Sequence, residues 1–431
     1  MTYQKLRSPA SRLIRAGHLL DRSMILYGSH NNWGQLNNPL AENGAVAFLL
    51  FAPLESCTVT TRAQLHRLQQ RIKEMPASHK VFSGGWAGYF SYEAGKALMN
   101  LPTGDVLLAE FSYYPMVIRL DFTSDVCEAF WQDDLPEEQV EQRLMQLQQL
   151  STAPSDSTPA TVNWLQLWDQ QEYSAAFNRI QDYLHAGDCY QVNLTMPFVS
   201  TQNLTHRSPY SLFQTFNPAF GGYMQTPHTT LFSVSPERFI CISNEHMETR
   251  PIKGTSARGC DEHTDLENKE WLRNSAKNQA ENLMIVDLLR NDMSFYAEPH
   301  SVRVDKLFDI ETHANVHHMV STISAVKRPQ YHAVDAVMAA LPGGSITGAP
   351  KRRAMEIIDE LEVRSRGAYC GAMGFFGNHG ISDFNILIRT IEAKADGAVC
   401  SGGGGIVVDS SAQEEWQEIF SKVKRILDTP F

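Results

Sequence analysis

Lys253 is the residue whose setting most directly suggests covalent chemistry. It lies in the segment PIKGTSARG, residues 251–259, with a proline before it and a glycine after it. Such flanking residues indicate a turn in which the backbone can approach a ligand closely. A lysine amine is a nucleophile only when it is neutral, which requires burial or a neighbouring cation to lower its pKa. The alternative is an ordinary surface lysine, since most lysines are solvated.

Residues suited to proton transfer follow or interrupt two apolar runs. Glu237 comes after the run TTLFSVSP, so its carboxyl could point from the end of a strand into a cleft as a general acid or base. A surface pair with the neighbouring Arg238 is the alternative. His317 and His318 are adjacent in NVHHMVST, and on a strand they would face opposite ways. One of them could line a site while the other is a core or surface residue.

Carboxylates on two predicted helices have the chemistry of a magnesium site. Glu281 lies in AENLMIVDLL, and Glu418 and Lys422 are four residues apart on one face of the last helix. Two carboxylates from different helices, with water and a substrate oxygen, suit Mg²⁺, a hard ion that keeps several waters. An exposed ion pair is the alternative for Glu418 and Lys422. Glu414 and Glu415 are predicted to be solvated helix charges.

Two glycine-rich segments could supply backbone donors. PGGSITGAP, residues 342–350, leads into a helix whose first turn contains Pro350 and Lys351, where amide groups can meet an anion. The glycines at 402–405 end a strand and could bring bare amides against a carboxylate. Neither segment matches a Walker A or dinucleotide fingerprint, so a nucleotide is not the expected ligand. Arg389, in the predicted strand ILIRT, needs an anionic partner, either internal or a ligand carboxylate.

The elements that must position these residues are strands and helices without regular alternation. A helix is predicted between Asp169, its cap, and Gly187, followed by the strand CYQVNLTM; further helices are predicted at 280–289, 350–361 and 412–427. The last begins with Ser411 and Glu414 at capping-box spacing. Apolar runs such as TTLFSVSPERFICIS and AVCSGGGGIVV predict strands. The pattern favours an α+β fold with antiparallel sheets.

The sequence divides at a stretch rich in Ser, Thr and Pro. Residues 151–163 have the composition of an exposed connector. Residues 1–150 form strand-like runs without a cluster that suggests chemistry, so this region is predicted to be structural or regulatory. Residues 164–431 contain every chemical candidate named above and are predicted to be the catalytic region.

Composition narrows the class of partner and compartment. The 431 residues are 43% hydrophobic, and 37 basic against 48 acidic residues give a net charge of −11. This balance argues against a nucleic-acid or anionic-membrane partner. No apolar run approaches the length of about 20 residues that spans a bilayer. Seven scattered cysteines without a CxxC pair favour a reducing cytoplasm.

Seven segments in order resemble the chorismate-utilising enzyme family. They are SPERF, PIKGT, AENLMIVDLLRND, VHHMVST, GGSITGAPK, IRT and GGGGIV, and the resemblance runs from about residue 165 to 428. It implies a fold of two large antiparallel β-sheets packed as a sandwich with helices on the outside, completed by the first half of the chain.

The resemblance also implies roles, residue by residue. Glu281 and Glu418 would hold Mg²⁺, which would receive the ring carboxylate of chorismate. Lys253 would attack ring C2, Glu237 would protonate the departing C4 hydroxyl, and His318 would stand near that carbon. The groups implied for the substrate carboxylates and polar edges are Gln191, Ser345, Thr347, Tyr369, Arg389, the amides near Gly403 and Gly405, and Lys422.

Two positions distinguish members of the family. Relatives that add water have a lysine at the position of Gln191, whereas ammonia users resemble this chain in having glutamine. Anthranilate synthases typically have alanine where this chain has Lys253, which members that make 4-amino-4-deoxychorismate share. The resemblance therefore implies amination of chorismate at C4 for p-aminobenzoate and folate synthesis, through a covalent lysine intermediate. The alternative is an anthranilate synthase component I of tryptophan synthesis, which would also eliminate pyruvate.

The source of ammonia is expected to be a separate glutamine amidotransferase subunit. No part of the chain resembles a glutaminase domain, and no candidate Cys–His pair is evident. Asn278 stands where some relatives have a second acidic residue, three positions before Glu281, so it is left out of the ligand set. A catalytically dead paralogue with a binding or regulatory role is an alternative of another class, against which the intact set of Lys253, Glu237, Glu281 and Glu418 argues.

Overall fold

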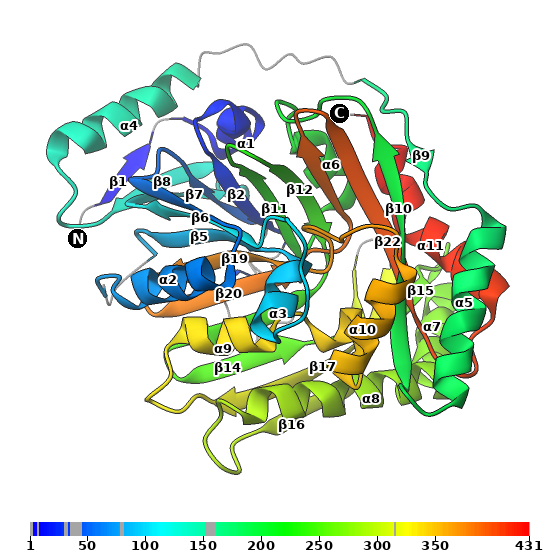
Figure 1. Ribbon diagram of the computed structural model, residues 1–431. Coiled ribbons are helices and arrows are strands. Elements are labelled where there is room, and N and C mark those ends of the chain that lie inside the picture. Colours follow the sequence, from blue (N-terminus) through cyan, green and yellow to red (C-terminus); the bar gives the residue numbers. More distant parts are fainter. Residues whose placement is uncertain are drawn as a thin grey trace.

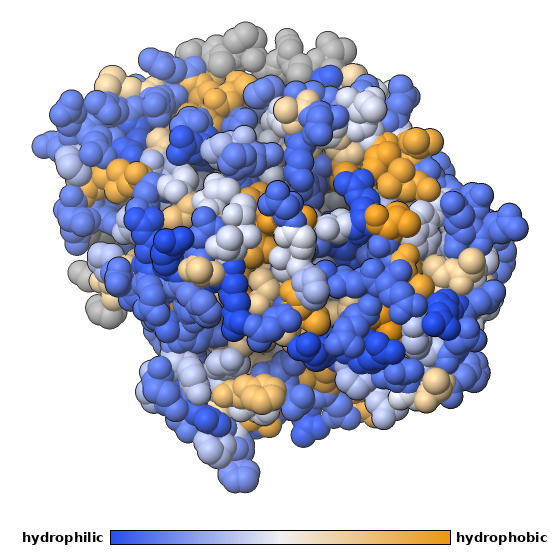
Figure 2. Space-filling model, viewed as in Figure 1, coloured by the Kyte–Doolittle hydropathy of each residue, from blue (hydrophilic) through white to orange (hydrophobic). Residues whose placement is uncertain are grey.

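Two large antiparallel sheets face each other, with helices on their outer sides (Figure 1). The structure is a computed structural model that describes residues 3–6, 8–29, 33–34, 45–77, 82–150, 160–313 and 316–430. The predicted fold class is confirmed. Figure 2 shows the same face of the molecule covered mostly by hydrophilic side chains, with hydrophobic ones in scattered groups.

The first sheet has twelve strands, and every strand pair that the structure describes in it is antiparallel. Their spatial order is β1 (Tyr3–Leu6), β8 (Val126–Trp131), β7 (Met116–Asp121), β3 (Val46–Leu50), β2 (Met24–Gly28), β11 (Phe220–Gln225), β12 (Thr230–Ser235), β21 (Thr390–Lys394), β22 (Gly397–Ile406), β10 (Gln191–Ser200) and β18 (Gly348–Ala349), with β9 (Leu165–Gln166) also on β10.

The second sheet has ten strands and is likewise antiparallel throughout its described pairs. Their order is β15 (Ile252–Ala257), β17 (Val316–Val326), β14 (His246–Arg250), β13 (Arg238–Ser243), β20 (Ile381–Ile386), β19 (Ala372–Gly377), β5 (Gly85–Phe90), β6 (Ala109–Tyr114) and β4 (Glu55–Val59), with β16 (Arg303–Thr312) on β17.

Helices cover the outer faces of both sheets. The described α-helices are α1 (Ala10–Ala16), α2 (Arg62–Lys73), α3 (Tyr92–Leu98), α4 (Glu137–Leu150), α5 (Gln170–His185), α6 (Tyr210–Phe216), α7 (Glu262–Arg273), α8 (Ala276–Ser294), α9 (Ala333–Ala340), α10 (Lys351–Leu361) and α11 (Ala412–Leu427), with two 3-10 turns, η1 (Gly17–Leu19) and η2 (Gly344–Ile346). Apolar residues of α5 and α11 pack on the first sheet, and those of α2, α8 and α9 pack on the second.

A third apolar cluster lies between the sheets, and its position decides where a site can form. It joins residues of β2, β3, β11 and β12 in one sheet to residues of β5 and β19 in the other. Around β10, β22, β15 and β17 the facing side chains include polar and charged groups instead. One end of the sandwich is therefore sealed by packing, and the other end carries the polar groups.

The predicted bounds agree with the structure at α5, α10 and α11, while the length of α8 and the cap of α11 differ from the prediction. Asp169 caps α5 as predicted, in a capping box with Glu172, and the bounds of α11 match. Helix α8 is longer than predicted, because the Ser275 side chain accepts from the Asn278 amide and starts it earlier. The predicted capping box of α11 is wrong, since Ser411 makes no side-chain cap hydrogen bond.

Strands from both parts of the chain share both sheets. β2 pairs with β11 in the first sheet, and β5 pairs with β19 in the second. Residues 151–159 of the predicted connector lie outside the described residues. All seven cysteines are free. Within the described ranges, no helix combines the length and the apolar character needed to cross a membrane.

Candidate active site

The candidate site begins where one strand of the first sheet stops short of its neighbour. β21 pairs with β22 from Lys394↔Gly397 to Ile391↔Cys400, and the pairing does not continue past Cys400. On this open side of β22, the Gly403 carbonyl accepts a hydrogen bond from Lys422 Nζ at 2.9 Å. A strand residue points its N–H and C=O to the same side, and alternate residues repeat the direction. The amides of Gly403 and Gly405 therefore both face the open side.

The glycines of β22 cannot be replaced without displacing a neighbour. A Cβ on Gly403 would lie 2.7 Å from the Leu194 carbonyl oxygen and 3.0 Å from the Tyr369 hydroxyl. On Gly404 it would lie 2.5 Å from Glu415 Oε2, and on Gly405 it would lie 2.9 Å from the side chain of Gln191. The glycine run thus lets two layers of side chains approach the strand from its two faces.

Helix α11 brings a carboxylate and an ammonium to the open edge. Lys422 Nζ lies 2.6 Å from Oε1 of Glu418, whose side chain is 52% exposed as in the ion-pair alternative, and it also donates to the Gly403 carbonyl, which ties the pair to the edge of β22. Burial opposes ionisation of Glu418, but the charge and hydrogen bond of Lys422 outweigh it and lower the pKa of Glu418. A carboxylate that stays ionised beside this edge can bind a cation.

The prediction that Glu415 is a solvated helix charge is wrong. Its side chain is buried against Gly404 and accepts a hydrogen bond from Ser410 Oγ at 2.8 Å. Burial raises the pKa of Glu415. The helix pattern gave no signal for this, because only the missing side chain of Gly404 makes room for the carboxyl. Glu414 is exposed as predicted.

Lys253 lies on strand β15 and not in a turn as predicted. Burial lowers the pKa of the Lys253 amine, and Lys422 adds to this effect, while Glu281, Glu237 and Glu418 oppose it. These four charged groups come from α8, the β12–β13 connection and α11, so the structure gathers most of the predicted catalytic set around one amine. The exposed surface lysine of the alternative interpretation is not what the structure shows.

The next residue explains how β15 is held. Gly254 has φ +91°, and a Cβ there would lie 2.9 Å from Cγ of Asn278. Asn278 itself donates to Ser275 Oγ at 2.9 Å. Asn278, which stands where some relatives have a second acidic residue, therefore packs against the strand that carries Lys253. Its side-chain amide bonds to Ser275, the residue that caps the start of α8.

Glu237 is buried between β12 and β13, at the strand end where it was predicted. Ser345 Oγ donates to its Oε1 at 3.2 Å. Burial raises the pKa of Glu237 to about 7, although Lys253 opposes the rise. The alternative of a surface pair with Arg238 is excluded, because Arg238 is buried and binds Glu248 at 2.7 Å and Asp383 at 3.0 Å.

His318 is the histidine of the pair that faces the candidate site. Its Nδ1 is 2.9 Å from Thr255 Oγ1, two residues beyond Lys253 on β15. Burial lowers the pKa of His318 to about 3, with help from Arg389, so the ring is neutral. Arg389 is not in a strand as predicted. It lies in the break between β20 and β21 with φ +52°, and it lies near enough to Glu237 to act on its pKa.

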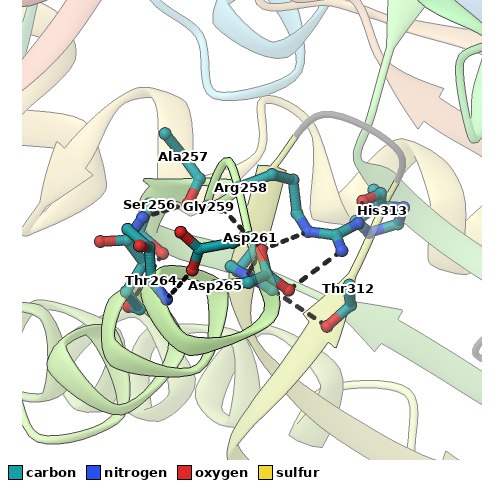
Figure 3. Close-up of polar contacts among 11 residues, drawn as sticks. Ser256, Ala257, Arg258, Gly259, Asp261, Thr264, Asp265, Thr312 and His313 are labelled. Atoms are coloured by element: carbon teal, nitrogen blue, oxygen red, sulfur yellow. Dashed lines mark hydrogen bonds and ion pairs between the residues drawn. The ribbon is translucent and has the colours of Figure 1, made fainter.

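Behind His318 a polar network ties β15 to its neighbours (Figure 3). Asp265 accepts from Arg258 Nε at 2.7 Å and from the Gly259 amide at 2.8 Å, and its Oδ1 is 3.1 Å from Nε2 of His317. The hydrogen bonds from Arg258 and Gly259 hold the pKa of Asp265 well below its usual range. His317 also contacts Thr312 at 3.0 Å. The network uses the SARG residues of the PIKGTSARG segment to fix the strand that carries Lys253.

The remaining predicted residues are near the same edge. Gln191 begins β10 and lies against Gly405, and the buried Tyr369 hydroxyl lies near Gly403. Thr347 donates its hydroxyl to Gly343 O at 2.9 Å, and its carbonyl accepts from Asn193.

The first turn of α10 does not offer a free cation. Lys351 Nζ lies 2.7 Å from Asp292 and also donates to the carbonyl of Ala340, so this lysine is already bound within the protein. A helix N-terminus with that side chain engaged contributes only its amides to any anion. The predicted anion contact at this helix is therefore confined to its backbone.

The donor set at the edge fits a hard divalent cation. The charges of Glu281 on α8 and Glu418 on α11 both act on Lys253, so both glutamates lie within electrostatic range of that amine. Among the residues that the structure describes, no three His, Cys, Asp or Glu side chains form a ready-made metal cluster. Two carboxylates with water and a substrate oxygen are a sufficient set for Mg²⁺, which seldom takes an all-protein cage.

Comparison with known proteins identifies a family over nearly the whole chain. The model of the chorismate binding enzyme family matches residues 26–428. A protein of Klebsiella aerogenes named aminodeoxychorismate synthase component 1 is 42% identical over 363 residues, which cover 83% of this chain and 79% of that protein. A protein of the same name from Escherichia coli (strain K12) is 40% identical over 384 residues, covering 86% and 84%. An anthranilate synthase component I-like protein of Synechocystis is 34% identical, covering 82% and 74%.

Solved structures share the fold. Anthranilate synthase component I of Streptococcus pneumoniae superposes with a TM-score of 0.77 at 25% identity, covering 89% of this chain and 92% of that one. The menaquinone-specific isochorismate synthase of Escherichia coli superposes with a TM-score of 0.73 at 16% identity, covering 99% and 94%. The second likeness bears on the fold alone.

Proposed function

The chain belongs to the chorismate binding enzyme family, and we propose that it aminates chorismate at C4 to give 4-amino-4-deoxychorismate for p-aminobenzoate and folate synthesis. Relatives at about 40% identity over most of the chain are named for this synthase activity. The observation that carries the proposal is Lys253, a partly buried lysine whose pKa is lowered by desolvation and whose charge interacts with Glu281, Glu237 and Glu418.

The proposed reaction is a double displacement through Lys253. The neutral amine bonds to ring C2, the two ring double bonds shift, and the C4 hydroxyl leaves as water with a proton from Glu237. Ammonia then bonds to C4 and returns a proton to Glu237, the double bonds shift back, and the lysine amine is expelled from C2. The enolpyruvyl group stays in place. Lys253 is held by a strand of the second sheet and Glu237 by the connection between the two sheets, so the reacting atoms meet in a fixed orientation.

Glu237 supports this scheme as the acid of the first step. Its pKa, raised to about 7 by burial, keeps a large share of the carboxyl protonated near neutral pH. The hydrogen bond from Ser345 engages Oε1 of Glu237. A general acid with a pKa near the working pH transfers its proton most effectively. His318 is neutral and can donate or accept one hydrogen bond near the same carbon.

Cations along the open edge of β22 would neutralise the two negative charges of the substrate. We assign Glu281 and Glu418 to Mg²⁺, which would bind the ring carboxylate and withdraw charge from it. Arg389, Lys422, Ser345, Thr347, Tyr369 and the amides of Gly403 and Gly405 would bind the carboxylates and polar edges, and Gln191 would face the amine donor. A protein with a net charge of −11 then presents local cations to its anionic substrate.

Ammonia is assigned to a separate glutamine amidotransferase subunit. The relatives are named component 1, which supports a second component.

Seven free cysteines fit a reducing compartment, so we place the reaction in the cytoplasm.

Product identification tests the proposal. The purified chain is incubated with chorismate, Mg²⁺ and ammonium chloride, and the products are separated by liquid chromatography and mass spectrometry. We expect 4-amino-4-deoxychorismate without pyruvate. Anthranilate with an equal amount of pyruvate would instead support the second candidate, which the anthranilate synthase component I-like relative favours. No turnover of chorismate would support a binding or regulatory paralogue.

A further inference from the structure

Helix α3 carries a buried carboxyl group, although it belongs to the part of the chain that shows no chemical motif. Glu93 lies in the first turn of this helix and is 1% exposed. Its Oε1 accepts from the backbone amide of Arg366 at 2.9 Å, and its Oε2 accepts from the amide of Gly367 at 3.1 Å. The Gly367 carbonyl in turn accepts from the Tyr92 amide at 2.9 Å. Glu93 therefore holds two successive amides of a segment far along the chain.

A second glutamate holds the next amide of the same segment. Ala368 N donates to Oε2 of Glu392, which lies on β21, at 2.9 Å. Gly367 has φ +63°, and a Cβ there would lie 2.5 Å from Glu392 Oε2. The three consecutive amides at 366–368 are thus bound by carboxyl groups of α3 and β21. An ionised carboxylate accepts such hydrogen bonds more strongly than a neutral group does. We call residues 366–368 the clamped turn.

The clamped turn places Tyr369, one of the residues predicted to bind the substrate. Tyr369 follows directly after the three bound amides and is buried. Its own amide donates to the Arg366 carbonyl at 3.3 Å. Its hydroxyl lies 3.0 Å from the position of a Cβ on Gly403, whose amide faces the open edge of β22. The place of this hydroxyl at the edge therefore depends on the clamped turn.

The side chain of Arg366 ties the clamped turn to two further parts of the candidate site. This buried guanidinium donates to the Asn193 carbonyl of β10 at 2.8 Å and to the Ile346 carbonyl of η2 at 3.1 Å. Ser345, also in η2, donates to Glu237 at 3.2 Å. A displacement of the clamped turn would therefore be felt at the wall of the site.

Helix α3 supports the same arginine through an aromatic ring. The guanidinium carbon of Arg366 lies 4.6 Å from the ring centroid of Tyr92, the neighbour of Glu93, and an aromatic face attracts a cation. Lys96, on the next turn of α3, pairs with Asp359 of α10 at 2.6 Å, and Figure 1 shows the two helices beside each other. The contacts of α3 are thus directed at α10 and at the clamped turn that follows it.

Resting on the proposed function, we propose that Glu93 is a positioning residue of the amination, which holds the clamped turn so that the Tyr369 hydroxyl meets chorismate at the edge of β22. Two adjacent amides need an acceptor at both oxygens of the side chain. A carboxylate offers this, whereas a glutamine would turn an NH₂ donor toward one of them. That buried amide would lose its partner, so the turn would shift to restore the bond.

The test separates positioning from stability. Glu93→Gln, Glu93→Asp, Tyr369→Phe and the double variant Glu93→Gln with Tyr369→Phe are compared with the unsubstituted chain. Initial rates of amine formation at saturating ammonium chloride give kcat and the KM for chorismate, and denaturant titration gives the stability.

The matched control is Glu110→Gln. Glu110, on β6, is 2% exposed, and burial raises its pKa to about 7, as it does for Glu93. Its Oε2 accepts from Thr226 Oγ1 at 2.6 Å, whereas Glu93 binds the amides of the clamped turn. This variant should lose stability like Glu93→Gln and keep the KM of the unsubstituted chain.

Glu93→Gln should raise the KM for chorismate about tenfold, with kcat changed by less than about threefold, because Lys253 and Glu237 are held by other elements. Glu93→Asp keeps the charge and should recover part of the loss. In the Tyr369→Phe background, Glu93→Gln should raise the KM much less, since the hydroxyl that it positions is already gone.

An unchanged KM in Glu93→Gln or in Tyr369→Phe would overturn the positioning role. The same fold-change for Glu93→Gln with and without the Tyr369 hydroxyl would also overturn it. If Glu93→Gln fails to fold, the comparison is made with Glu93→Asp, and an unchanged KM there would overturn it. Absence of amine product from the unsubstituted chain would instead overturn the proposed function.

Discussion

At the scale of single residues, burial shifts the pKa values of Lys253 and Glu237 in opposite directions, and both shifts favour the same reaction. It lowers the pKa of Lys253 and raises the pKa of Glu237 to about 7. Desolvation disfavours whichever form is charged, so the amine moves toward its nucleophilic form and the carboxyl toward its acidic form. Their mutual attraction works against both shifts, and the structure shows that burial outweighs it.

A change at Glu237 should therefore alter the pH dependence of the first step. The rate of Lys253 adduct formation should fall on the acid side as Lys253 is protonated, and on the alkaline side as pH rises through about 7 and Glu237 loses its proton. Glu237→Gln should slow adduct formation by about 100-fold and remove the limb near pH 7. Stopped reactions analysed by intact mass across pH 5 to 9 give both limbs.

The matched control for this profile is Glu414→Gln, because Glu414 is an exposed glutamate on α11. It should leave both limbs in place. Retention of the limb near pH 7 in Glu237→Gln would contradict the assignment of that limb to Glu237.

Sequence reasoning reached most residues of the candidate site but not their environments. Lys253 and Glu237 were found because proline, glycine and a preceding strand mark unusual positions. The burial of Glu415 was missed, since it depends on a glycine of another strand. Contacts between elements far apart in the sequence leave no local pattern. The roles of the predicted site residues stay predictions.

At the scale of elements, the site depends on two interruptions in regular structure. β21 begins only at Thr390, which frees the edge of β22, and the pairing of β15 with β17 is irregular between Ile252 and Thr255, where Lys253 and Gly254 lie near α8. The run FNILIRTIEAK looks like one strand because its apolar residues are continuous. The break at Arg389 was not predicted, because positive φ at an arginine is set by the surrounding fold and not by its own preference.

A side chain at Gly254 should disturb both stability and catalysis. Gly254→Ala places a Cβ at φ +91° and 2.9 Å from Asn278, so β15 must move. We expect a loss of about 1–3 kcal/mol in the free energy of unfolding from backbone strain. Adduct formation should slow by about 10- to 100-fold because Lys253 is displaced. Denaturant titration and adduct kinetics measure the two effects.

Gly104→Ala separates strain from displacement. Gly104 also has a positive φ, +70°, but a Cβ there meets nothing within 4 Å. This variant should lose comparable stability and keep the full rate per folded molecule. Equal rates for Gly254→Ala and Gly104→Ala would show that the position of β15 does not govern the reaction.

At the scale of the whole molecule, the sandwich is built by both parts of the chain. The family resemblance drawn from seven segments is confirmed, because the family model matches residues 26–428. This range includes most of residues 1–150, in which no chemical motif was found. That first part provides β2 beside β11 and β5 beside β19. The division at residues 151–163 stays a prediction about roles, since strands on either side of it share both sheets.

Residues 164–431 expressed alone should fail to fold. Without β5 and β2, the long edges of β19 and β11 lose their partners, and the cluster between the sheets loses half of its residues. Near-ultraviolet circular dichroism should show no fixed tertiary structure, and co-expression with residues 1–150 should restore it. A separate fragment that turned over chorismate would contradict this dependence.

The most direct measurement of the account's central claim is the intact mass of the protein after incubation with chorismate and Mg²⁺ in the absence of ammonia. We predict an added mass equal to chorismate less one water, located on Lys253 by peptide mapping and removed when ammonium chloride is added. Lys253→Ala should show no addition while keeping its fold. An unmodified mass for the unsubstituted chain that still produces amine with ammonia would contradict the covalent route.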